Sequence, residues 1–150
     1  MAVYMGVDPG RVGAIALLDT SLNRIVCHDM PDTTSKLHDL LVECPVIKGC
    51  VVEKPYYPQM IGVTNATRIA MAYGTLIGAL QWLDIPFREI APSKWKAAMD
   101  LSSNKNASRE AASRAFPAHA DLFRLKKHDG RAEAALLALY ASDNRRRWAA

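Results

Sequence analysis

Short apolar runs that end in a turn signal alternate along the first third of the chain. The run that ends at Asp8 is followed by Pro9-Gly10, and a second apolar run starts at Ala14. Together they predict a hairpin with Asp8 at the end of its first strand. A β-branched run, an acidic residue and a proline follow one another again in residues 50–55. The pattern predicts strands near 2–8, 13–19, 23–29 and 48–53.

Longer segments with helical character fill the rest of the chain. A helix is expected around 34–43, and a long helical stretch is expected from about 64 to 83. A strand near 86–91 follows. Further helices are expected at 92–99, 105–116 and 131–142. Three strands, followed by helices that alternate with strands, are the order of a mixed sheet covered by helices, so the pattern predicts the α/β class.

Two glycines, Gly74 and Gly78, lie four residues apart inside the long helical stretch. Each glycine costs a helix up to about 1 kcal/mol relative to alanine. One explanation is close packing of this helix on the sheet. The other is close approach of a second copy of the chain. Either would account for both glycines.

Acidic residues stand at the ends of two predicted strands and at the start of the last helix. Asp129 and Glu133 are four residues apart, so a helix places both carboxylates on one face, where they repel each other. The pair indicates either a cation site or the preference of acids for a helix N-terminus. Asp8 and Glu53 follow predicted strands, where open α/β sheets place ligands. Three separate segments therefore offer carboxylates, which hard divalent cations such as Mg²⁺ prefer.

A set of motifs follows in order along nearly the whole chain: Gly6–Gly10 with Gly13-Ala14, Val52-Glu53, Tyr57–Gln59, Tyr73-Gly74 with Gly78, Pro92–Lys96 and Asp129–Ala134. In these motifs the chain resembles the RuvC-type Holliday junction resolvases of the ribonuclease H-like superfamily, in particular the chloroplast resolvases and their bacterial and phage relatives. The resemblance implies a ribonuclease H-like α/β fold, a mixed five-stranded sheet flanked by helices. It also implies one nuclease domain over residues 1–150.

The activity that the resemblance implies is that of a crossover junction endodeoxyribonuclease, which resolves four-way DNA junctions in recombination and repair. Two Mg²⁺ ions per active site, with Mn²⁺ as a substitute, would assist in-line hydrolysis of the phosphodiester. Asp8 would bridge both ions. A homodimer would match the two-fold symmetry of a junction. The residues implied as catalytic metal ligands are Asp8, Glu53, Asp129 and Glu133.

The last motif leaves its first position open. Relatives differ in whether Asp or His stands there, and this chain has both, as His128-Asp129. The four-residue helical spacing to Glu133 favours Asp129 as the ligand. His128 is then an indirect partner of the metal site, a phosphate contact or a solvated neighbour.

The segment 54–62 contains two prolines and a glycine, which argue against regular structure, yet it also carries two tyrosines. Its aromatic side chains either tuck into the core or wedge and stack against unpaired bases. In the chloroplast-type relatives this loop is associated with base recognition.

Basic side chains gather on segments that lead towards the carboxylates. Lys94 and Lys96 flank Trp95 at the start of a predicted helix, where free N–H groups attract phosphate. Trp95 itself is interpreted as a core residue, and Arg145–Arg147 as a nonspecific tail. The residues expected to contact DNA are Tyr56, Tyr57, Gln59, Met60, Lys94, Lys96, Lys105, Arg109, Lys127, His128 and Arg131.

Composition agrees with this interpretation. A chain of 150 residues, half of them hydrophobic, has enough apolar residues for one core. The 19 Lys and Arg exceed the 15 acids and give a net charge of +4, which suits a polyphosphate partner. The three cysteines are odd in number and lack metal-site spacing, so reduced thiols are expected. Without a secretory signal or membrane-spanning run, the expected location is the cytoplasm of a bacterial or phage-infected cell.

Two other classes of protein share parts of this pattern. The actin-like ATPases and sugar kinases have the same sheet, but they need two such domains and a second phosphate loop. A non-cleaving protein that binds branched DNA could keep the same fold. The four carboxylates argue against it, because a protein that only binds gains nothing from negative charge that faces phosphates.

Overall fold

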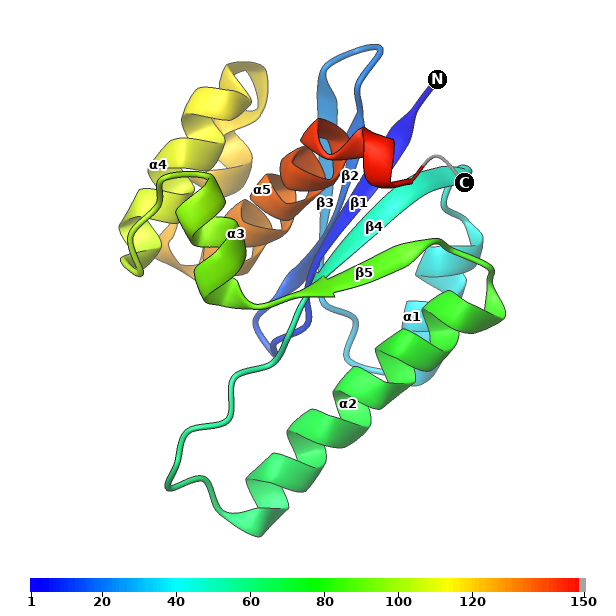
Figure 1. Cartoon of the computed structure of the whole chain (residues 1–150), viewed down its shortest axis with the longest axis vertical. Coiled ribbons are helices and arrows are strands. Elements are labelled where there is room, and N and C mark those ends of the chain that lie inside the picture. The colour runs from blue at the N-terminus through cyan, green and yellow to red at the C-terminus, as the bar shows by residue number, and fades with distance from the viewer. Residues whose placement is uncertain (149–150) are drawn as a thin grey trace.

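The computed structural model describes residues 1–148 and has a five-stranded sheet at its centre (Figure 1). The strands are β1 (Val3–Asp8), β2 (Ala14–Asp19), β3 (Arg24–Asp29), β4 (Ile47–Glu53) and β5 (Phe87–Ile90). Their order in the sheet is β3-β2-β1-β4-β5. The first three strands are antiparallel, whereas β1, β4 and β5 run parallel. The sheet is therefore mixed and five-stranded, as predicted.

The helices are α1 (Thr34–Val42), α2 (Val63–Trp82), α3 (Pro92–Ala98), α4 (Lys105–Ala115) and α5 (Asp129–Asp143). Every predicted helix and strand is present, with its ends within two residues of the expected positions. Three 3-10 turns were not predicted: η1 (Pro117–Phe123), η2 (Lys126–His128) and η3 (Arg145–Arg147). Within residues 1–148, no helix combines the length and the apolar character needed to cross a membrane.

Helices cover both faces of the sheet (Figure 1). α5 packs across β1, β2 and β4, and α4 lies against α5. α1 and α2 lie on the opposite face. The central strand β1 alternates between the two cores, since Tyr4 belongs to the α5 side and Met5 to the α1–α2 side. Each face of β1 thus packs against an apolar core, which explains why its residues form a continuous buried hydrophobic run.

Gly6 lets α5 approach β1 more closely than any other residue would. A Cβ atom at Gly6 would lie 2.1 Å from the backbone oxygen of Ala134 and 2.3 Å from the nitrogen of Ala138. Helix and strand therefore meet backbone to backbone at this point. This contact sets the height of the first turns of α5 above the end of β1.

The amino-terminal half of α2 and the preceding loop extend away from the sheet (Figure 1). Only Leu76 and Leu80 of this helix are buried, and both lie in its second half. A Cβ atom at Gly74 or Gly78 would meet nothing within 4 Å among the described residues. Close packing on the sheet therefore does not explain the two glycines.

Candidate metal centre

Two strand ends bring the first two carboxylates to one edge of the sheet. Asp8 is the last residue of β1, and Glu53 is the last residue of β4. The two strands are parallel neighbours with Val7 paired to Val52, so the next residue of each strand projects at the same level. The register of the sheet alone therefore places Asp8 beside Glu53.

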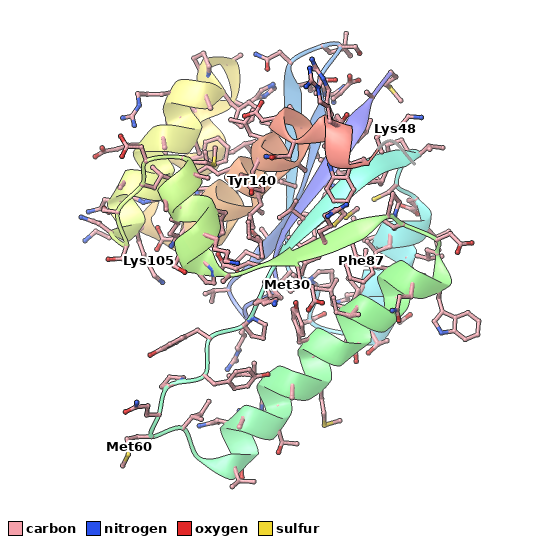
Figure 2. The ribbon with its side chains drawn as sticks, in the orientation of Figure 1. Met30, Lys48, Met60, Phe87, Lys105 and Tyr140 are labelled. Atoms are coloured by element: carbon pink, nitrogen blue, oxygen red, sulfur yellow. The ribbon has the colours of Figure 1, made fainter. Side chains whose placement is uncertain are left out.

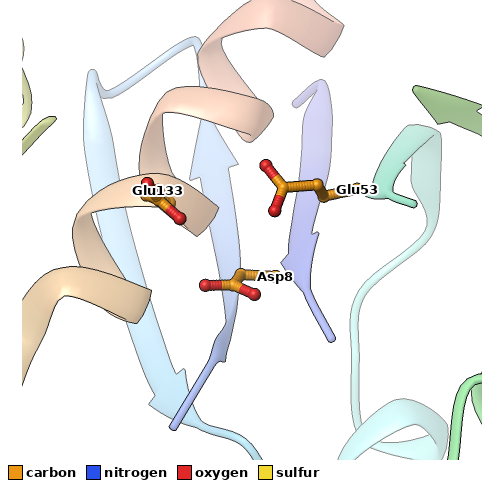
Figure 3. Close-up of side chains that lie close together, drawn as sticks. All are labelled: Asp8, Glu53 and Glu133. Atoms are coloured by element: carbon orange, nitrogen blue, oxygen red, sulfur yellow. The ribbon is translucent and has the colours of Figure 1, made fainter. Parts of the chain in front are cut away.

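Helix α5 supplies the third carboxylate. Glu133 lies at the start of α5 and points to the ends of β1 and β4, so that the three acidic side chains face one another (Figure 3). One oxygen atom from each of Asp8, Glu53 and Glu133 lies within 4.8 Å of the other two. The structure thus brings together three of the four predicted ligands, from the start, the middle and the end of the chain.

The electrostatics of this group favour a bound cation. Burial and, after it, the charge of Glu133 raise the pKa of Asp8 to about 6, against a hydrogen bond donated by the Gly10 N–H at 3.1 Å. Burial likewise raises the pKa of Glu53 to about 7, opposed by a hydrogen bond from Trp95. Carboxylates that are as costly to ionise as Asp8 and Glu53 gain most from a divalent ion beside them. Their oxygen-only donor set fits Mg²⁺ or Mn²⁺.

Lys96 provides the positive charge nearest to this group. Its Nζ lies 2.7 Å from Oε1 of Glu133, and both side chains are largely buried, at 17% and 11% exposure. Lys105, which is exposed on α4, also lowers the pKa of Asp8 through its charge. Lys96, expected to contact DNA, therefore holds a carboxylate of the site in this structure, while Lys94 is exposed.

Asp129 does not join the other three carboxylates. It lies on α5 one turn before Glu133, as the spacing predicted, but its Oδ1 lies 3.1 Å from Nε of Arg109. The two atoms form an ion pair without hydrogen-bond alignment. Arg109 also donates to the backbone oxygen of Arg124. Separate cations on Asp129 and Glu133 relieve the repulsion that the spacing implies, and a ligand role for Asp129 stays a prediction.

His128 lies in the turn before α5 and outside the carboxylate group. Its side chain is buried, and its Nδ1 accepts a hydrogen bond from the backbone N–H of Leu125 at 3.3 Å. Burial and the charge of Arg131 lower the pKa of His128. The ring thus closes the turn that leads into α5, and DNA contact by His128 stays a prediction.

Arg131 is held by a bidentate ion pair. Its Nε and Nη2 lie 2.6 and 2.7 Å from the two carboxylate oxygens of Asp29, at the end of β3. This pair joins the start of α5 to the strand at the edge of the sheet. Lys127, in contrast, is exposed. Of these two predicted DNA contacts, only Lys127 has a freely exposed position in this structure.

The loop 54–62 leaves the metal centre and projects away from the sheet. Tyr56 is 76% exposed and Met60 is 95% exposed, and Figure 2 shows Met60 at the tip of the loop, pointing outward. Gln59 and Tyr57 are also exposed. The aromatic side chains of the loop therefore do not tuck into the core, and their contact with bases stays a prediction.

A hollow of about 390 Å³ lies between this loop and α2. Its wall includes Asp8 and Glu53, and also Tyr56, Arg68 and Tyr73. A larger hollow, of about 660 Å³, lies along β5 and the end of α5 and contains none of the three carboxylates. The smaller hollow is therefore the one that adjoins the carboxylate group. Arg68 in its wall is a basic residue that the sequence analysis did not identify as a candidate.

Two further residues that touch the carboxylates were not predicted. The indole Nε1 of Trp95 donates a hydrogen bond of 2.5 Å to Oε2 of Glu53. The hydroxyl of Ser108, fully buried on α4, lies 3.5 Å from Oε1 of Glu133. The signal for Trp95 was its buried position, since a buried indole N–H needs an acceptor.

Comparison with known proteins identifies the fold. No protein-family model matches the sequence, and no curated protein is significantly similar to it. Among solved structures, that of Thermus thermophilus RuvC in complex with a Holliday junction substrate superposes with a TM-score of 0.69 at 14% identity and covers 98% of this chain and 96% of its own. A second structure of Thermus thermophilus RuvC gives a TM-score of 0.63 at 14% identity and covers 97% and 96%. The chain therefore has the ribonuclease H-like fold of RuvC-type resolvases.

Proposed function

We propose that this protein is a structure-selective endonuclease that resolves four-way DNA junctions by divalent-metal-dependent hydrolysis of phosphodiester bonds. The observation that carries the proposal is the group formed by Asp8, Glu53 and Glu133 on a RuvC-type fold. A RuvC of this fold has been solved with a Holliday junction substrate. A desolvated set of three carboxylates, two at strand ends and one on α5, has little structural use, and it suits a cation that acts on phosphate.

The three carboxylates would hold two Mg²⁺ ions, with Mn²⁺ as a substitute. When bound, these ions supply an activated water and neutralise charge on the leaving 3′ oxygen. Asp8 would bridge both ion positions. Glu53 and Glu133 would each complete one of them, and Asp129 would join Glu133 if Arg109 moves to a phosphate.

Basic residues around the site would neutralise and orient the DNA backbone. Lys96 and Lys105 lie close enough to the carboxylates to influence Glu133 and Asp8. With a cation at Glu133, Lys96 is released to donate to a phosphate oxygen. Lys94 and Lys127 are exposed on either side and extend the positive surface. Such contacts supply affinity without reading sequence.

The loop 54–62 and the hollow behind it would contact bases next to the cut. The hollow joins the carboxylates directly, and its walls combine apolar and aromatic groups with Arg68. An unpaired base needs such a surface to stack on. We assign base selectivity to Tyr56, Tyr57, Gln59 and Met60, which project from this loop.

A homodimer would present two such sites to the two strands of one junction. The exposed face of α2 is the surface that we assign to this contact. Val63 and Met71 of this helix are 83% and 68% exposed, and the positions of Gly74 and Gly78 are open. Exposed apolar side chains beside open glycines suit close approach of a second helix, and a symmetric junction favours a two-fold pair.

The alternative is a protein of the same fold that binds branched DNA and does not cut it. The pKa values of Asp8 and Glu53, raised to about 6 and about 7, argue against it. Carboxylates that are this costly to ionise weaken both the fold and the attraction to phosphate unless a cation joins them.

Cleavage of a synthetic four-way junction tests the proposal. The junction, labelled on each strand in turn, is incubated with the protein in Mg²⁺ and, in parallel, in chelator. We expect paired nicks near the crossover in Mg²⁺ only, and none on a linear duplex of the same sequence. Tight junction binding without nicks in either Mg²⁺ or Mn²⁺ would establish the non-cleaving alternative.

A further inference from the structure

Trp95 connects the core of the protein to one of the metal-binding carboxylates. Its side chain is fully buried among the apolar residues on the α5 side of the sheet. Its only polar atom, Nε1, donates a 2.5 Å hydrogen bond to Oε2 of Glu53, 42 residues away in sequence. The apolar packing of the ring therefore holds the indole N–H in place. That N–H donates to Glu53, a predicted metal ligand.

The topology of the sheet explains why these two residues meet. Glu53, the last residue of β4, is paired with Ile90, the last residue of β5. α3 begins at Pro92, directly after this strand, and its first turn carries Trp95 back over the end of β4. The short connection thus brings the indole Nε1 to the carboxylate of Glu53.

A residue that only fills space in the core would not need a hydrogen bond to Glu53. Leucine or phenylalanine fills an apolar site without a donor, whereas a buried indole N–H costs free energy unless it finds an acceptor. A backbone carbonyl usually supplies one, as Ala141 does for Nε1 of Trp148 at 3.0 Å. Trp95 instead uses the carboxylate of Glu53, and this bond opposes the effect of burial on that group.

We propose that Trp95 is a positioning residue of the metal centre: its indole N–H fixes the orientation of the Glu53 carboxylate and leaves the second carboxylate oxygen for a cation. Partners that orient metal ligands in this way contribute roughly ten- to a hundredfold to metal affinity. The inference rests on the proposed function, because it takes Glu53 to be a metal ligand.

The test compares Trp95→Phe with a matched control. Trp95→Phe keeps an aromatic ring and removes the donor. Trp148→Phe removes an indole N–H that bonds a backbone carbonyl away from the carboxylates. Each variant is titrated with Mn²⁺ by calorimetry, and its single-turnover cleavage of a four-way junction is followed at increasing Mg²⁺.

We expect Trp95→Phe to bind Mn²⁺ about tenfold more weakly and to need about tenfold more Mg²⁺ for half of its maximal rate. Saturating Mg²⁺ should restore most of that rate. Trp148→Phe should match the wild type in both measurements. Equal Mn²⁺ affinity of Trp95→Phe and wild type would overturn the inference. A wild-type protein that neither binds Mn²⁺ nor cuts would instead overturn the proposed function.

A second variant keeps the inference testable if Trp95→Phe does not fold. The chain has three tryptophans, so Trp82→Phe combined with Trp148→Phe leaves Trp95 as the only indole. Bound at the neighbouring Glu53, paramagnetic Mn²⁺ should quench its fluorescence with the dissociation constant found by calorimetry. Calorimetric binding with unchanged emission would show that the ion is not held beside Trp95, and the inference would fail.

Discussion

Asp8 is the acid that we assign to both ion positions, so its charge matters to each of them. Asp8→Asn keeps the size of the side chain and removes that charge. We expect it to lower cleavage by about a thousandfold or more, since metal stabilisation of the transition state amounts to several kcal/mol. Junction binding in chelator should change by less than about twofold, because the basic surface is unaltered.

Single-turnover rates and binding isotherms on the same junction check both halves of this expectation. Asp32→Asn is the matched control, since Asp32 is an exposed acid outside the group and pairs with Lys36. A variant at Asp8 that cuts at near-normal rate would refute the assignment of the metal centre.

The three candidates in the last motif should separate clearly. Glu133→Gln removes a member of the group, and we expect it to lower the cleavage rate by about a thousandfold or more. Asp129→Asn should also be strongly impaired, whereas His128→Ala should keep most of its rate. Rates at saturating Mg²⁺ measure the order of the three. Collapse in His128→Ala with near-normal Asp129→Asn would transfer the ligand role to the histidine.

The raised pKa values of Asp8 and Glu53 predict how pH acts on the metal-free protein. In the unfolded chain these acids have their ordinary pKa values, 3.8 and 4.5, but in the folded protein the pKa values are raised to about 6 and about 7. The folded state binds their protons more tightly, so their contribution to stability is greatest below pH 4 and is lost as pH rises through 6 to 7.

Asp8→Asn cannot lose a proton there, and its melting temperature relative to wild type should therefore rise between pH 5 and pH 7 in chelator. Excess Mg²⁺ should restore the melting temperature of the wild type at pH 7. Asp32→Asn provides a flat reference, since Lys36 lowers the pKa of Asp32 and keeps it ionised across this range. A constant difference between Asp8→Asn and wild type would contradict the raised pKa.

At the residue scale, the sequence predicted the positions of those acids that are placed by a strand end or by helical spacing. Asp8 and Glu53 were identified because each ends an apolar run, and the sheet register does bring them together. The ion pairs of Lys96 and Arg109 were not predictable, because several basic residues could reach the same acids. Trp95 was interpreted as core, which is correct for its ring but not for its N–H.

Among the elements, the loop 54–62 is the one expected to choose where the DNA is cut. Replacing Tyr57, Gln59 or Met60 by alanine should blur the preferred cut sites or slow cleavage, with affinity changed by less than about twofold, because phosphate contacts dominate binding. Cut sites on junctions of varied central sequence, with isotherms at two salt concentrations, measure both.

Lys94→Ala is the contrasting variant for this loop. It should weaken binding to all junctions evenly and lower the salt slope by about one, with cut sites unchanged. If the loop variants lose affinity strongly and keep their cut sites, the loop is a backbone clamp.

The order and type of the elements were predictable because each has its own hydrophobic period and turn signal. The depth at which α5 sits on β1 was not. It depends on Gly6 and on backbone atoms of Ala134 and Ala138, which are distant in sequence and carry no periodic signal. The 3-10 turn η2 was missed for a different reason: a local bond from the N–H of Leu125 to the ring of His128 closes it, and no hydrophobic period marks so short a segment.

At the scale of the whole molecule, the exposed face of α2 predicts association of two chains. Gly74→Leu should fold normally, because a Cβ atom there meets nothing within 4 Å among the described residues. It should nevertheless shift the protein from dimer towards monomer and slow paired cutting of one junction. Light scattering after size exclusion measures the mass, with Gly74→Ala as the mild control. A wild-type protein that is monomeric at all concentrations would contradict this prediction.

The three acids of the metal centre come from the first strand, the fourth strand and the last α-helix of the chain, and this spread governs when activity can arise during synthesis. Domains emerge from the ribosome amino-terminal end first. Asp8 and Glu53 leave it long before Glu133, and α5 must still dock through Gly6. A chain that stops before Glu133 therefore lacks one of the three acids and, under the proposed function, would have no assembled site with which to nick DNA.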